Sequence, residues 1–154
     1  MTAAIPPSEL TDHVGYWLRQ VSNHVSQAFA RKVEAHGVTV AEWVLMRQLL
    51  GEDRLPPSQI AERMGMTRGA VTKLADRLIT KSLLVREADP EDGRAQTLAL
   101  TPKGRKLVPK LAALADANDA EFFDLHLTKS DRAALLRILR RIAETRALKS
   151  PPID

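Results

Sequence analysis

Hydrophobic residues recur every three or four positions along the first part of the chain. The recurring positions are Leu10, Val14, Trp17 or Leu18, Val21, Val25, Ala28 and Phe29. This spacing is the period of an amphipathic helix. It predicts one long helix from about Ser8 to Ala35, which Gly37 ends.

A second helix is predicted from about residue 40 to 50, because Thr39 begins a capping pattern. Its side chain can accept a hydrogen bond from the backbone N–H of Glu42, while the Glu42 side chain can reach back to the cap. Gly51 follows the last apolar position of this helix. The pattern therefore predicts a short helix with a defined start.

Two further helices are predicted close together. Pro57 is suited to the first turn of a helix over Pro57–Met64. Gly65 can end that helix in a left-handed conformation, and Thr67 can cap the next one.

The next helix, from Thr67 to about Lys81, has one apolar face, formed by Val71, Leu74, Ala75 and Leu78. The opposite face is polar and mainly basic, and it contains Arg68, Gly69, Thr72, Lys73 and Asp76, with Arg77 near its edge.

The spacing of Ala61, Gly65 and Val71 is that of a helix-turn-helix. The two helices cross closely, which requires a small side chain at Ala61, a turn at Gly65 and an apolar wedge at Val71. An ordinary helical hairpin would explain Ala61 and Gly65. It would not explain a cationic outer face followed by a hairpin that carries arginine.

After residue 82 the hydrophobic period becomes that of strands. Leu83–Arg86 and Thr97–Leu100 flank a polar tip over Asp89–Arg94, which predicts a β-hairpin, or wing. Helices are then predicted from Pro102, capped by Thr101, and from Thr128.

The predicted fold class is mainly α with a small β-wing, a winged helix-turn-helix combined with long flanking helices. The expected regions are a helical region over 1–36 and 102–149, a winged helix-turn-helix, DNA-binding region over 37–101, and a flexible tail over 150–154.

The charge distribution agrees with a binding function for the middle of the chain. The 154 residues carry a net charge of +4. Residues 54–106 contain 11 basic and 6 acidic residues, net +5, which leaves net −1 for the rest. A basic centre indicates either a polyanion-binding module or a solvated charged surface.

Composition excludes several other classes. The chain has no cysteine, which rules out disulfides, thiolate catalysis and cysteine-ligated zinc. No apolar stretch is long enough for a membrane span, and the N-terminus lacks the pattern of a signal peptide, so we expect no membrane partner and a cytoplasmic location.

An enzyme is the main rival class, and the sequence gives it little support. It has no nucleophile elbow, no H-E-x-x-H and no phosphate-binding G-x-x-x-x-G-K. The four histidines are never three or four residues apart. Asp12-His13 is either a fragment of a metal site or a surface or dimer contact. We expect no catalysis, no cofactor and no metal.

The segment from Pro57 to Gly104 resembles the winged-helix core of the MarR family of bacterial regulators. The residues that carry the resemblance are the run Leu74–Leu78, the strand Leu83–Arg86, the wing signature Asp92-Gly93-Arg94 and the run Leu98–Gly104. The number, order and length of the flanking helices also fit. The resemblance implies a homodimer in which the first, fifth and sixth helices interlock and two lobes read successive major grooves of double-stranded DNA. By this resemblance the long helices of 1–36 and 102–149 are the dimerisation helices and form the helical dimerisation region. Two positions depart from the family: Ser82 stands where glycine is common, and Gly93 where a second cation is common. At Ser82 the turn therefore requires either backbone strain or a shifted helix end.

The candidate DNA contacts lie on the outer helix face and at the wing tip. Arg68 and Lys73 are candidates for phosphate or guanine contacts, with Thr67 and Thr72 in reach of phosphates or thymine methyls and Gly69 allowing close approach. A solvated helix surface is the alternative for each.

Three further residues belong to the same candidate site. Arg77 can contact DNA or pair with an acid of its own lobe. Arg94 has the character of a minor-groove anchor. Asp92 is better suited to orienting a cation than to touching DNA, because phosphates would repel its carboxylate.

A candidate effector pocket comprises His13, Tyr16, Trp17, Trp43 and Arg47. These aromatic residues are equally suited to core or dimer packing, and Arg47 can pair with an acidic effector or cover apolar surface. The expected function is transcriptional regulation, with a repressor released from a pseudo-palindromic operator by a small aromatic or phenolic effector. The alternative is a winged-helix protein-interaction module without operator specificity.

Overall fold

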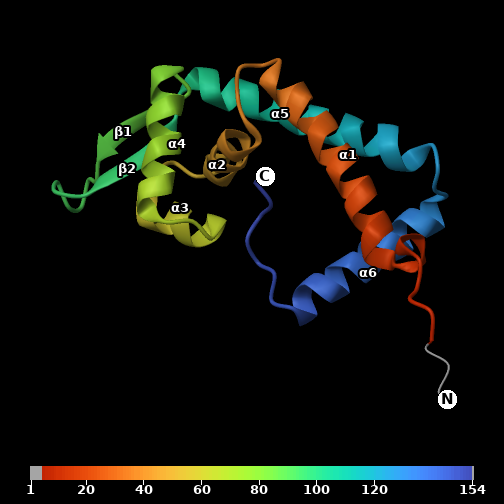
Figure 1. Ribbon diagram of the computed structural model, residues 1–154. Coiled ribbons are helices and arrows are strands. Elements are labelled where there is room, and N and C mark those ends of the chain that lie inside the picture. The colour runs from red at the N-terminus through yellow and green to blue at the C-terminus, as the bar shows by residue number, and fades with distance from the viewer. Residues whose placement is uncertain (1–4, 154) are drawn as a thin grey trace.

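The structure is a computed structural model that describes residues 5–153. Over these residues the chain folds into six α-helices, two short helical turns and one β-hairpin (Figure 1). The elements are η1 (Leu10–Asp12), α1 (Val14–Glu34), α2 (Val40–Leu49), α3 (Pro57–Met64), α4 (Arg68–Thr80), β1 (Leu84–Ala88), β2 (Gln96–Leu100), α5 (Pro102–Asp119), η2 (Ala120–Asp124) and α6 (Lys129–Thr145). The predicted fold class, mainly α with a β-wing, is confirmed.

Two parts of the molecule are visible in Figure 1. Helices α2, α3 and α4 and the hairpin form a lobe, while α1, α5 and α6 extend away from it as a frame. The core of the lobe is apolar and includes Leu45, Met46, Leu49, Ile60, Met64, Leu78, Leu84 and Leu98, each at most 1% exposed. Since Val33 of α1 and Val108 and Leu111 of α5 join this core, the frame is anchored to the lobe.

The wing is a two-stranded antiparallel sheet. Its register pairs Leu84 with Leu100 at the base and Ala88 with Gln96 near the tip. Leu55, in the link between α2 and α3, adds a third segment by exchanging two backbone hydrogen bonds with Leu98, at 3.0 and 2.8 Å. This bridge ties the base of the wing to the lobe.

The start of the first helix differs from the prediction. Helix α1 begins at Val14 rather than near Ser8, because His13 is extended with φ −94° and ψ 126°. The preceding turn η1 is stabilised locally: the Asp12 carboxylate accepts a hydrogen bond from the Glu9 N–H at 3.0 Å. Local hydrogen bonding of this kind competes with helix formation, and it overrides the periodicity at Leu10, which is 73% exposed.

Four threonines cap the starts of helices. Their hydroxyl oxygens accept from the backbone N–H three residues on at 3.0 to 3.2 Å; the pairs are Thr39 with Glu42, Thr67 with Ala70, Thr101 with Gly104 and Thr128 with Asp131. The caps predicted at Thr39, Thr67 and Thr101, and the helix start predicted at Thr128, are confirmed. Each bond satisfies one of the N–H groups that a helix start leaves without a partner.

The turn after α4 confirms the strain expected at Ser82. Ser82 adopts φ +62°, a left-handed conformation that is unfavourable for a side chain with a Cβ. The turn is held by a hydrogen bond from the Thr101 hydroxyl to the Ser82 carbonyl at 2.7 Å. Thr101 therefore joins the end of α4 to the start of α5.

The C-terminal segment, predicted as a flexible tail, lies against the lobe as far as residue 153. Ala147, at φ +54°, turns the chain after α6. Ser150 then approaches Gly65 so closely that a Cβ at Gly65 would collide with it. Ile153 packs against the hydrophobic core. Figure 1 shows this segment returning from α6 towards α2.

No helix within residues 5–153 combines the length and apolar composition that a bilayer span requires.

Replacing Ser82 with glycine tests the strain in the turn. We expect Ser82→Gly to raise the free energy of unfolding by about 0.5–1 kcal/mol, because glycine adopts positive φ without steric cost. Ser82→Ala is the matched control: it removes the hydroxyl but keeps the Cβ, so it should not stabilise the protein. Urea unfolding of the three proteins checks this, and equal stability of Ser82→Gly and the parent protein would contradict it.

Candidate nucleic-acid interface

Helix α4 has one buried face and one exposed face. The buried face consists of Val71, Leu74, Ala75 and Leu78, each at most 3% exposed. The residues predicted for the outer face are all exposed: Thr67, Arg68, Gly69, Thr72, Lys73, Asp76 and Arg77. The predicted orientation of this helix is therefore confirmed, with its cations directed to solvent.

The turn between α3 and α4 has the predicted geometry. Gly65 adopts φ +64° and ends α3. The Met66 N–H bonds to the Ala61 carbonyl at 3.0 Å, which closes the turn. Ala61 and Val71 are 6% and 0% exposed, so the small residue and the apolar wedge both lie between the helices.

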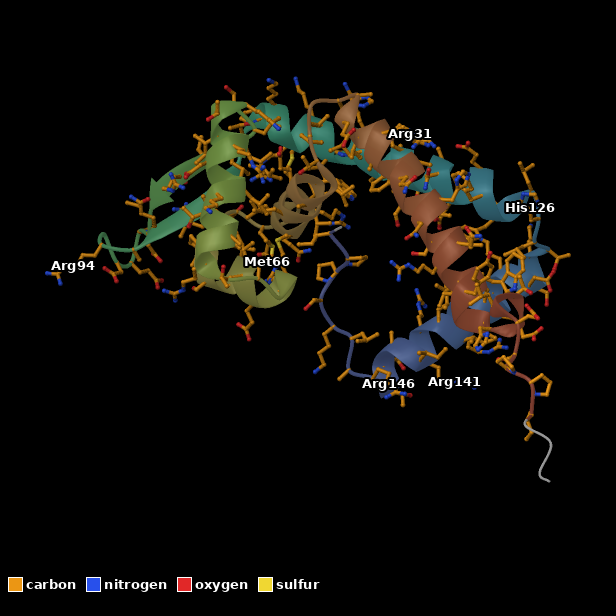
Figure 2. All side chains as sticks on the ribbon, in the orientation of Figure 1. Arg31, Met66, Arg94, His126, Arg141 and Arg146 are labelled. Carbon is orange, nitrogen blue, oxygen red and sulfur yellow. The ribbon has the colours of Figure 1, made fainter. Side chains whose placement is uncertain are left out.

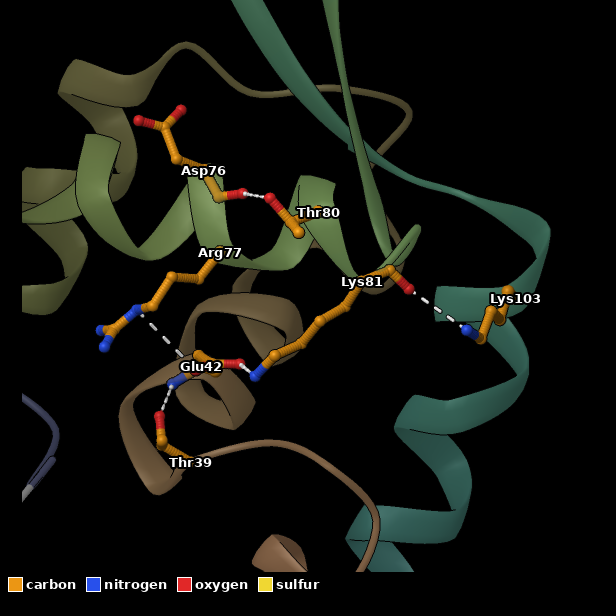
Figure 3. Close-up of polar contacts among 7 residues, drawn as sticks. All are labelled: Thr39, Glu42, Asp76, Arg77, Thr80, Lys81 and Lys103. Atoms are coloured by element: carbon orange, nitrogen blue, oxygen red, sulfur yellow. Dashed lines mark hydrogen bonds and ion pairs between the residues drawn. The ribbon is translucent and has the colours of Figure 1, made fainter.

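A buried carboxylate fixes the other end of α4. Glu42 of α2 is 1% exposed, and it accepts a hydrogen bond from Lys81 Nζ at 2.6 Å (Figure 3). Arg77 Nε lies 3.9 Å from the second carboxylate oxygen. Both cations come from α4 or its C-terminal cap, so this ion pair joins α4 to α2.

The prediction that the Glu42 side chain reaches back to its own cap is wrong. The carboxylate is used across the lobe instead, because Lys81 and Arg77 face it. The sequence did contain a signal for this. Glu42 shares a helix face with Leu45, Met46 and Leu49, all of which are buried, and a charge on such a face requires a partner.

A second ion pair connects α4 with the wing. Arg86 of β1 donates to the Asp76 carboxylate at 2.7 Å. The helical period places Asp76 on the outer face without a partner, and no sequence pattern assigns a role to Arg86. The pair holds the base of the wing beside the exposed face of α4, which fixes the angle between the two cationic elements.

The wing tip carries Arg94 away from the rest of the molecule. Figure 2 shows this side chain at the far end of the hairpin, extended into solvent. The Asp92 side chain accepts from the Arg94 backbone N–H at 3.1 Å. Asp89 likewise accepts from the Glu91 N–H at 2.9 Å. Asp92 therefore holds the backbone at Arg94, and its orientation of the cation itself remains a prediction.

Three cations of this surface are without an acidic partner. Within residues 5–153 no carboxylate lies within 4.0 Å of the charged groups of Arg68, Lys73 or Arg94. Arg77, in contrast, faces Glu42, although its side chain is 58% exposed. The Thr72 hydroxyl donates to the Arg68 carbonyl at 2.9 Å, which leaves its oxygen able to accept. The surface thus presents unneutralised positive charge on α4 and at the wing tip.

The candidate effector residues do not share one cavity. Trp17 lines an apolar groove of about 490 Å³ between α1 and α6. Trp43 lines a different cavity, of about 260 Å³, together with Phe29 of α1 and Pro151 and Pro152 of the C-terminal segment. Arg47 is exposed on α2 and lines neither.

The other two members of the set lie at the start of α1. His13 Nδ1 donates a hydrogen bond to the Glu9 carbonyl at 3.0 Å, and the ring of Tyr16 packs edge-on against Trp17. In the described part of the chain, no three histidine or acidic side chains are grouped so that they could hold a metal ion.

Replacing Glu42 tests how α4 is anchored. We expect Glu42→Gln to lower the free energy of unfolding by about 1–3 kcal/mol, because the amide keeps the volume but loses the charge-assisted bond to Lys81. The control is Glu62→Gln on the exposed surface of α3, which should change stability little. Urea denaturation measures both, and an equal effect of the two substitutions would count against the anchoring role.

Comparisons with known proteins agree with this geometry. The model of the MarR family matches residues 36–95. The transcriptional repressor MdtR of Bacillus subtilis is 28% identical over 136 residues, which cover 88% of this chain and 87% of that protein.

Solved structures are also similar. A probable transcriptional regulator from Pseudomonas aeruginosa superposes with a TM-score of 0.74 at 26% identity, covering 87% of this chain and 99% of that one. CouR from Rhodococcus jostii RHA1, solved with p-coumaroyl-CoA, gives a TM-score of 0.73 at 25% identity and covers 89% and 96%.

Proposed function

The chain belongs to the MarR family of winged-helix transcriptional regulators, and from this premise we propose that it binds a pseudo-palindromic operator as a homodimer and represses the adjacent genes. It is a regulator and not an enzyme, since its relatives are transcriptional regulators. The proposed ligand of the lobe is double-stranded DNA.

One observation carries the proposal: the exposed face of α4 and the tip of the wing both present cations that no carboxylate of residues 5–153 neutralises. A helix of this kind fits the major groove, and Arg68 and Lys73 would contact phosphates or guanine there. Arg94 would enter the neighbouring minor groove, where the negative potential is concentrated. Thr67 and Thr72 would reach phosphates or thymine methyls, and Gly69 would allow close approach of the helix to the DNA.

The homodimer is proposed from the frame. Helix α6 has no buried side chain in the isolated chain. Apolar residues of α1 and α6 are instead exposed, among them Val14 (81%), Leu18 (51%), Leu139 (39%) and Ile142 (52%). An apolar surface of this extent is typical of an interface. A second copy packed on α1 and α6 would cover it.

Regulation would follow from the spacing of the two lobes. The recognition helices of a dimer reach successive major grooves only when they are about 34 Å apart. A small molecule that binds preferentially to another spacing would release the DNA by linkage. Because CouR was solved with p-coumaroyl-CoA, aromatic acids and their thioesters are the first effectors to test. The cavity beside Trp43 lies between frame and lobe, where such a ligand could act.

The alternative function, protein interaction without operator specificity, is separated from this one by a DNA-selection experiment. Operator binding should fall steeply with added salt and should retain a preference for one pseudo-palindromic site in the presence of competitor DNA. Salt-sensitive binding without sequence preference would favour the alternative.

Removing the wing-tip cation should weaken DNA binding. We expect Arg94→Ala to reduce operator affinity by about 1–3 kcal/mol without unfolding the protein, because the exposed arginine makes no ion pair within its own lobe. Lys129→Ala, which removes an exposed cation from α6, is the control and should bind the operator like the parent protein. Fluorescence anisotropy with the selected duplex checks both, and an unchanged affinity of folded Arg94→Ala would contradict the role of the wing.

A charge in the apolar surface should separate the dimer. We expect Leu18→Glu to yield monomers, because an unpaired carboxylate in an apolar interface is not solvated. Gln27→Glu is the matched control, since this exposed residue lies on the opposite side of α1. Sedimentation velocity gives the mass of each. A dimeric Leu18→Glu protein would argue against an α1 and α6 interface.

A further inference from the structure

A cationic cleft lies where three helices meet, apart from the proposed DNA-binding surface. It has a volume of about 510 Å³, which is in the range of small-molecule sites. Its lining comes from the end of α1, the end of α4 and the first turns of α5. The lining residues are His36, Gly37, Lys81, Leu83, Lys103, Lys106, Leu107 and Lys110. We call this the lysine cleft.

Four lysines line the lysine cleft, and among residues 5–153 no aspartate or glutamate lines it. Lys103, Lys106 and Lys110 are spaced by three and four residues, so they follow one another along a single face of α5. Lys81 approaches from the end of α4. Leu83 and Leu107 add apolar surface between these cations. The cleft therefore combines a dense positive charge with an apolar floor.

Two of the lysines are already held in place, as Figure 3 shows. Lys81 donates to the buried Glu42 carboxylate at 2.6 Å, and Lys103 donates to the Lys81 carbonyl at 3.1 Å. These bonds fix one wall of the cleft.

The other two lysines have no such role. Within residues 5–153, no carboxylate pairs with Lys106 or Lys110, and both are exposed. The cleft thus has a rigid side and two cations that stabilise no other part of the fold. Lysines kept this close together without an anion repel one another, and a multiply charged anion removes that repulsion.

We propose that the lysine cleft binds a small organic phosphate, whose phosphate groups lie among Lys103, Lys106 and Lys110 and whose ring or other apolar part covers Leu83 and Leu107. Phosphate is the anion that matches this charge, since a lysine ammonium binds phosphate oxygens as a point charge. The apolar floor favours an organic phosphate over the inorganic ion.

The lysine cleft lies at the opposite end of α4 from Arg68. Arg68 begins α4 and Lys81 caps its end, so at 1.5 Å per residue about 20 Å of helix separates Lys81 from Arg68 and about 12 Å separates it from Lys73. A ligand in the cleft would touch α1, α4 and α5 at once, which connects the frame with the recognition helix. Only this regulatory consequence rests on the proposed function; the binding site itself does not.

Calorimetric titration of the purified full-length protein, in EDTA and low salt, tests the site with three probes: ATP, inorganic pyrophosphate and adenosine. We expect ATP to bind more tightly than pyrophosphate, and adenosine not to bind measurably. The double variant Lys106→Gln/Lys110→Gln should weaken ATP binding about tenfold, from the loss of two charge pairs. The control Lys129→Gln/Lys149→Gln loses the same charge from other exposed positions and should bind ATP like the parent protein.

Three results would overturn the proposal. The first is no binding of ATP or pyrophosphate by the parent protein at about 1 mM. The second is equal loss of binding in the control, which would indicate a diffuse charge effect. The third is loss of operator affinity in ligand-free Lys106→Gln/Lys110→Gln, which would assign these lysines to the DNA backbone. Operator binding by the parent protein is measured in parallel, so a failure of the lysine cleft leaves the proposed function standing, and the reverse also holds.

Discussion

The burial of one face of α4 is the constraint on which the rest of the molecule depends. A short helix that directs cations to solvent gains little stability from its exposed face, so packing of the opposite, apolar face must fix its position. Val71, Leu74, Ala75 and Leu78 provide this by packing into the lobe. Polar contacts then fix the end of α4 and the position of the wing, which apolar packing leaves undetermined. Glu42 fixes the end of the helix against α2, and Asp76 fixes the wing through Arg86.

Much of the fold could be predicted from the sequence because its signals are local. The threonine caps act within one helical turn, and each was found where the pattern placed it. Gly65 and Ser82 are similar cases, since a left-handed turn depends on the few residues around it. The outward orientation of Arg68 and Lys73 followed from the period of the apolar face opposite them.

The contacts that could not be predicted join residues far apart in the chain. Glu42 and Lys81 are 39 positions apart, and their bond requires α2 and α4 to be packed first. Asp76 and Arg86 depend in the same way on where the hairpin leaves α4. The error at the start of α1 had another cause, because hydrogen bonding around Glu9 and Asp12 outweighed the periodicity. The grouping of the effector residues remains a prediction, and the structure places Trp17 and Trp43 in different cavities.

The C-terminal segment gives the lobe a second tether. The lobe is joined to α6 covalently through α5. It is joined a second time through Ile153, which packs against its core, and through Ser150, which contacts the helix-turn-helix at Gly65. A rigid-body rotation of the lobe about its junction with α5 would stretch the segment between α6 and this attachment. The lobe can therefore swing only as far as these few residues extend, unless the segment first peels away from the core.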